Sequence, residues 1–73
     1  MTRKQKPTLT QREKEVMQSV GAGMTSKEIA NKLELSPRTI QAYLENIYWK
    51  LDVSGHNARH AAYAVVCKLN LLD

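Results

Sequence analysis

The sequence has little of what secreted, disulfide-linked or membrane-spanning proteins need. It contains one cysteine, Cys67, so no disulfide can form within the chain, and this sparing use of cysteine fits a reducing cytosol. No apolar run approaches the roughly 18 residues of a membrane span, and no signal-peptide core follows the basic start MTRKQKPT. We therefore expect a cytoplasmic protein without membrane attachment, in which residues 1–8 form a flexible basic arm or the remnant of a linker.

The components of a metal or catalytic site are also scarce. His56 and His60 are four residues apart, but His56 falls in a predicted loop and no fourth ligand joins these two and Cys67, so no metal site is expected. No motif pairs either histidine with a nucleophile or a carboxylate, and no phosphate-binding loop is present. The sequence predicts neither enzymatic activity nor a cofactor.

Length and charge narrow the remaining classes. A chain of 73 residues forms one domain, and so small a domain rarely has more than about 5 kcal/mol of stability, which argues against a deep catalytic cleft. Eleven Lys and Arg against seven Asp and Glu give a formal net charge of +4. This charge favours a polyanionic partner, nucleic acid before an anionic membrane, although it could equally serve solubility alone.

Local signals predict four helices, at approximately 10–21, 26–33, 37–51 and 58–70. The stretches TQRE, which begins at Thr10, and TSKE, which begins at Thr25, are capping boxes that start the first two helices. Gly21 and Gly23 are expected to end the first helix. Ser36 can cap the third helix, and Pro37 suits its first position. No β-type alternation appears, so the predicted fold is all-α, a four-helix bundle.

The second and third predicted helices form a helix-turn-helix. A helix of about two turns, a three-residue connector and a longer helix make up this motif, in which the second of the pair enters the major groove of DNA. The apolar stripe of the third helix comprises Ile40, Leu44, Ile47 and Leu51. The apolar face of the last helix comprises Ala61, Ala62, Val65, Val66 and Leu69.

With that stripe facing the core, the third helix turns an unusual row of side chains outward. At about 100° per residue, Arg38, Ala42, Glu45 and Trp49 lie on the far side, and Gln41 flanks them. Ala42 allows close approach to base edges, Gln41 can bind adenine, and Glu45 can accept a hydrogen bond from cytosine. An ordinary solvated surface, in which Glu45 only pairs with a nearby cation, is the alternative.

Other polar residues are predicted to contact the DNA backbone. The helix starts supply Thr25, Ser26, Lys27, Ser36, Arg38 and Thr39. Tyr43 is expected to pack beside the core with its hydroxyl toward a phosphate. Trp49 is also predicted to contact the DNA backbone as an exposed residue, and the alternative is a core-edge residue folded over Val53.

Residues 9–53 resemble the LuxR-type helix-turn-helix domain, also called GerE- or FixJ-type. The stretches LTQREKEVM, GMTSKEIA, LSPRTIQAY and NIYWKLDV carry this resemblance. It implies a four-helix DNA-binding domain, here residues 9–73, which is the output domain of a bacterial transcription regulator. It also implies that Gln41, Ala42 and Glu45 read bases, and that Lys50 and residues 25–27 contact the DNA backbone. Gln41 and Glu45 stand where the family often has basic residues, and Trp49 stands where it commonly has Arg.

Three hypotheses from different classes follow. The leading one is sequence-specific binding of double-stranded DNA at a promoter or operator, with a homodimer contact through the fourth helix in which Tyr63 and Cys67 take part. The second is a module like region 4 of a sigma factor, which would contact promoter and RNA polymerase together. The third is a protein-interaction bundle anchored by Trp49 and Tyr63.

Overall fold

The computed structural model describes residues 8–72, which form four helices and no strand. They are α1 (Gln11–Gly21), α2 (Ser26–Leu33), α3 (Pro37–Leu51) and α4 (Ala58–Lys68). The predicted all-α fold is confirmed. The expected arm at residues 1–8 lies outside the described residues except for Thr8.

Polar side chains start three of the helices as the sequence predicted. The Thr10 hydroxyl accepts from the Glu13 amide at 3.2 Å, and the Glu13 carboxylate accepts from the Thr10 amide at 2.9 Å. The same reciprocal pair joins Thr25 and Glu28, at 3.1 and 2.8 Å. The Ser36 hydroxyl accepts from the Thr39 amide at 3.1 Å. Each helix start therefore satisfies amides that would otherwise lack a partner.

The C-terminus of α4 departs from prediction. The helix ends at Lys68, two residues before the expected boundary, and Asn70 adopts a left-handed conformation with φ of 57°. The next amide, of Leu71, donates back to the Val66 carbonyl at 2.9 Å, and the Asn70 amide donates to the Cys67 carbonyl at 3.2 Å. Because asparagine tolerates this conformation, Asn70 ends the helix as a glycine would.

Gly21 ends α1 as the sequence predicted, but it does not do so by adopting a left-handed conformation. Gly21 is the last residue of α1, and of the two glycines expected to end this helix only Gly23, with φ of 86°, takes the left-handed conformation. A methyl group at Gly21 would meet the ring of Tyr63 from α4. Gly21 therefore allows close contact between two helices, a role that depends on a residue far away in the sequence.

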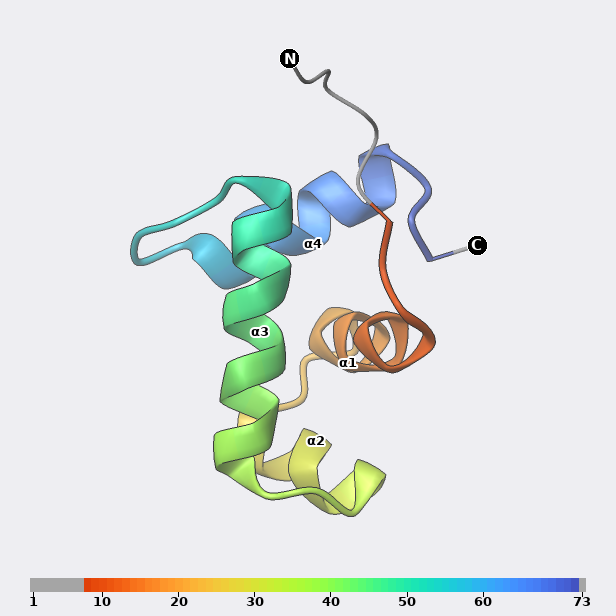
Figure 1. The fold of residues 1–73 in the computed structure, drawn as a ribbon, viewed down its shortest axis with the longest axis vertical. Helices are drawn as coiled ribbons and strands as arrows, with labels where there is room; N and C mark the ends of the chain where they lie inside the picture. Colours follow the sequence, from red (N-terminus) through yellow and green to blue (C-terminus); the bar gives the residue numbers. More distant parts are fainter. Residues whose placement is uncertain (1–7, 73) are drawn as a thin grey trace.

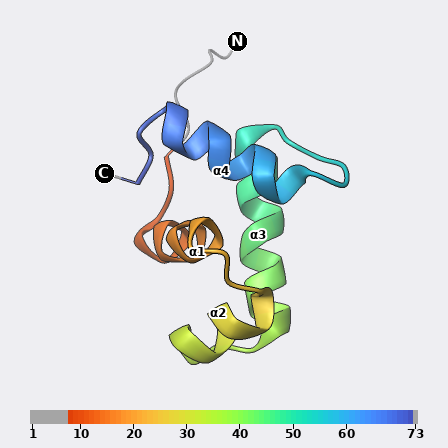
Figure 2. The same ribbon diagram turned by 180° about the vertical axis from the view of Figure 1, so that it is seen from behind.

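The third helix is the centre of the packing. It contacts α1, α2 and α4, and Ile40, Leu44 and Ile47 on its inner side are completely or almost completely buried. Figure 1 shows α3 running along the length of the molecule, with α2 at one end, α4 across the other and α1 between them. Figure 2 shows the same arrangement from behind, with α4 crossing the C-terminal end of α3.

A buried carboxylate ties α1 to the far end of α3. The Lys50 ammonium lies 2.7 Å from the Glu13 carboxylate, whose side chain is only 6% exposed. The same carboxylate accepts the Thr10 amide of the capping box. Glu13 thus combines a helix cap with an ion pair whose carboxylate is shielded from water, so that removal of one partner is costly.

We predict that Glu13→Ala lowers the free energy of unfolding by about 2 kcal/mol, because it removes the cap and leaves Lys50 without its carboxylate. Urea denaturation followed by circular dichroism measures the loss. Glu15→Ala is the matched control, since Glu15 pairs with Arg12 at an exposed site and its removal should cost less than about 0.5 kcal/mol. Equal losses in the two variants would contradict the role given to Glu13.

Candidate nucleic-acid interface

The turn between α2 and α3 fixes the relative orientation of the two helices. Glu34 adopts a left-handed conformation with φ of 60°, and the Leu35 amide donates to the Ala30 carbonyl at 2.9 Å. The Leu35 side chain packs against the core. Ser36 then caps α3. The connector is therefore three residues long, and each of the three has a defined conformation or contact. This is the helix-turn-helix arrangement that the sequence predicted.

The outward side of α3 is open to solvent. Figures 1 and 2 show α1 and α2 beside α3 on one side, with α4 crossing near its C-terminal end, and along the outward side the residues from Arg38 to Trp49 are exposed. Gln41, Ala42 and Glu45, the predicted base-reading residues, are all exposed. We call the exposed residues of this side the α3 outer face: Arg38, Gln41, Ala42, Glu45, Asn46 and Trp49.

Asn46 is a member of this face that the sequence interpretation did not include. It is exposed and lies one helical turn after Ala42, closer to the centre of the outer face than Gln41 at 100° per residue. Its side-chain amide can donate and accept together, as adenine recognition in the major groove requires. The periodicity that selected Ala42 could have identified it.

The aromatic residues of α3 divide between surface and core. Trp49 is 84% exposed, so of the two interpretations of this indole the exposed one is correct. Tyr43 is partly buried and packs against the core, which agrees with the expected packing, while its contact with a phosphate stays a prediction. Tyr48 is also partly buried; burial raises the pKa of its hydroxyl, and the nearby charge of Arg59 opposes that shift.

The predicted backbone-contacting residues have different surroundings. Lys27 and Arg38 are exposed at the starts of α2 and α3. Thr39 is half-buried, and its hydroxyl lies 3.0 Å from that of Ser36. Ser26 accepts a hydrogen bond from Arg59, a residue of α4 that the sequence interpretation did not single out. Lys50 is paired with Glu13, so its ammonium would have to contact the Glu13 carboxylate and the DNA backbone at the same time.

The residues considered for metal binding and dimerisation lie in the last loop and in α4. His56, His60 and Cys67 are exposed, and within residues 8–72 no group of three potential ligands is close enough to hold a metal ion. Tyr63 is half-buried against Gly21, and its interaction with the Cys67 side chain raises the pKa of the tyrosine hydroxyl. Their part in a dimer contact stays a prediction.

The sequence matches a described protein family over most of its length. The model of "Bacterial regulatory proteins, luxR family" matches residues 7–64. The chain belongs to this family. The luxR-family match includes the whole helix-turn-helix and the start of α4, and it confirms the prediction of a DNA-binding domain of a bacterial transcription regulator.

Three relatives illustrate the similarity. The "uncharacterized response regulatory protein YgeK" of Escherichia coli is 51% identical over 45 residues, 62% of this chain and 31% of that protein. The "spore germination protein GerE" of Bacillus subtilis is 40% identical over 52 residues, 71% of this chain and 70% of that protein. The "probable transcriptional regulatory protein NarL" of Mycobacterium tuberculosis is 36% identical over 67 residues, 92% of this chain and 30% of that protein.

The matches to YgeK and NarL span a larger share of this chain than of those two proteins. This luxR-family domain corresponds to less than a third of the YgeK and NarL proteins. No solved structure matches it significantly. None of the helices described in residues 8–72 is long and apolar enough to cross a membrane.

We predict that Trp49→Ala changes the free energy of unfolding by less than about 0.5 kcal/mol, because the indole makes little contact with the domain. Leu44→Ala, on the buried side of the same helix, should cost about 2–5 kcal/mol. Urea denaturation must be followed by circular dichroism, since one variant lacks the tryptophan. A loss above about 1.5 kcal/mol for Trp49→Ala would show that the outer face of α3 is part of the packing.

Proposed function

We propose that this luxR-family domain binds double-stranded DNA sequence-specifically, with α3 in the major groove, as the output domain of a transcription regulator in the bacterial cytoplasm. The observation that carries the proposal is the division of α3 into two sides. Ile40, Leu44 and Ile47 are sealed in the core, while Ala42 and its hydrogen-bonding neighbours are exposed. A helix held from one side is the element that fits a major groove.

The chemistry of the outer face suits base edges more than phosphates. Ala42 leaves room for close approach and can contact a thymine methyl group. Gln41 and Asn46 carry amides suited to adenine, and the Glu45 carboxylate can accept only from a donor such as cytosine N4. Because Glu45 repels phosphate, it contributes discrimination between sequences and lowers non-specific attraction.

The cations and hydroxyls at the helix starts supply the complementary backbone contacts. Lys27 and Arg38 are exposed beside the N-termini of α2 and α3, where helix amides also favour anions. The starts of these two helices also carry four hydroxyl side chains, those of Thr25, Ser26, Ser36 and Thr39. Contacts of this kind orient α3 on the duplex without reading its sequence.

For Gln41→Ala and Glu45→Ala we predict altered preference at individual base positions, worth about 1–3 kcal/mol each. Selection of preferred duplexes from a randomised library, followed by titration of each variant, measures this. For Lys27→Ala we predict that affinity falls almost equally for all sequences. The salt dependence of the affinity should decrease by the amount expected for about one lost phosphate contact.

Lys68→Ala is the matched control for charge, since Lys68 is an exposed cation in the last turn of α4, which lies at the opposite end of the molecule from the starts of α2 and α3 (Figure 1). It should leave sequence preference unchanged. Binding of all duplexes with equal affinity at every salt concentration would contradict the proposal. Binding of RNA polymerase or of another protein through Trp49, without DNA binding, would favour the two alternative functions.

We also propose that α4 carries a homodimer contact that includes Tyr63 and Cys67, and that the regulator contacts RNA polymerase when bound to DNA. The exposure of Cys67 and the partial exposure of Tyr63 support the dimer contact. We predict that sedimentation detects two copies of the domain per duplex, and that Cys67→Arg restores one copy by placing a charge in the contact. A single copy both free and on DNA would remove the dimer from the proposal.

A further inference from the structure

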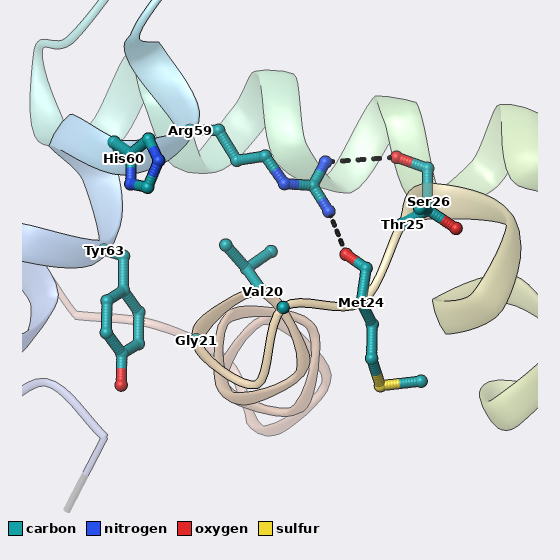
Figure 3. A pocket seen from close by; sticks show the side chains of 9 residues that line it. Val20, Gly21, Met24, Thr25, Ser26, Arg59, His60 and Tyr63 are labelled. Atoms are coloured by element: carbon teal, nitrogen blue, oxygen red, sulfur yellow. Dashed lines mark hydrogen bonds between the residues drawn. The ribbon is translucent and has the colours of Figure 1, made fainter.

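A groove of about 620 Å³ separates α4 from the turn that joins α1 to α2. Figure 3 shows Arg59 reaching across this groove from α4 toward Met24 and Ser26, with Tyr63 and His60 beside it and Val20 below. The guanidinium is the only group drawn in the figure that bridges the two walls by hydrogen bonds.

Arg59 binds the residues on both sides of the α2 cap. Its Nη1 donates to the Ser26 hydroxyl at 3.3 Å, and its Nη2 donates to the Met24 carbonyl. Thr25, the N-cap of α2, lies between these two acceptors in the chain. The planar guanidinium presents several donors in a fixed geometry, so one side chain can hold both acceptors together.

The first turn of α2 has few other attachments. The turn before it contains Gly23 in a left-handed conformation and Met24, which packs against the core, while Thr25, Lys27 and Glu28 are exposed. The first buried residues of α2 are Ile29 and Ala30, the fourth and fifth residues of the helix. The capping box orders this turn internally, but Arg59 is the described contact that joins it to α4.

The hydrogen bond from Arg59 also determines what the Ser26 hydroxyl can do. Because the hydroxyl oxygen accepts from the guanidinium, its own proton remains available for an outside acceptor. The nearby positive charge strengthens a bond from that proton to an anion.

We propose that Arg59 is a positioning residue of the helix-turn-helix, which holds the first turn of α2 where Thr25, Ser26 and Lys27 meet a DNA phosphate. The contact with a phosphate rests on the proposed function. The positioning of the first turn of α2 rests on the hydrogen bonds that Arg59 makes in the free domain. Arg59 acts through Ser26 and Met24 and does not itself contact DNA. The role requires the forked guanidinium, so a positive charge alone does not fulfil it.

The test compares Arg59→Ala, Arg59→Lys and the charge control Lys68→Ala in two measurements. The first is amide hydrogen exchange of the free domain at Glu28 and Ile29, whose amides donate to the Thr25 hydroxyl and carbonyl. The second is affinity for a selected duplex as a function of salt concentration. Both are made under conditions where circular dichroism shows each variant folded.

We expect both Arg59 variants to speed exchange at Glu28 and Ile29 while exchange at Leu44 in α3 stays slow. Both should bind the duplex about tenfold more weakly, the effect of losing one charge-assisted hydrogen bond, with a smaller salt dependence. Lys68→Ala should resemble the parent in both measurements. Ser26→Ala, which removes one acceptor and leaves Arg59 in place, should weaken binding, and the double variant with Arg59→Ala should lose no more than Arg59→Ala alone.

Two outcomes would overturn the inference. If Arg59→Lys restores affinity and salt dependence with exchange unchanged in all variants, Arg59 contacts the phosphate directly. If both Arg59 variants weaken binding by lowering global stability, exchange at Leu44 will rise together with exchange at Glu28. Failure of the parent domain to bind any duplex would refute the proposed function, while the exchange measurement would still decide whether Arg59 orders α2.

Discussion

The burial of one side of α3 is the constraint on which the rest of the structure depends. Ile40, Leu44 and Ile47 recur at the spacing of one helical face, and their burial against three helices fixes the rotation of α3 about its own axis. That rotation decides which side chains reach solvent. A shift of one residue in this stripe would bring Gln41 toward the core and remove the outer face, so packing and recognition are set by the same residues.

Contacts between sequence-distant residues then hold α3 relative to its neighbours. Glu13 and Lys50 join α1 to the C-terminal part of α3, and Arg59 joins α4 to the start of α2. In a domain this small, a few such ties are a large share of the total stability. These contacts also matter for the proposed function, because the start of α2 and the outer face of α3 must contact the DNA at the same time.

The sequence predicted those features that depend on neighbouring residues. Thr10, Thr25 and Ser36 start helices through bonds to residues three positions away, so their effect could be inferred locally. Gly21 was misinterpreted because its role is set by Tyr63, and Arg59 was missed because its partners are 33 and 35 residues away. The end of α4 was placed too late, since Asn70 can either continue a helix or end it. Asn46 is different, because its periodicity was visible in the sequence.

The most direct test of major-groove binding by α3 is nuclear magnetic resonance of the domain bound to a selected duplex, with the Ala42 methyl group and the Asn46 side-chain amide as probes. If α3 lies in the major groove, both probes show through-space contacts to base protons or thymine methyl groups of that groove. Contacts only to minor-groove protons, or a bound duplex that leaves the resonances of α3 unchanged, would contradict major-groove binding.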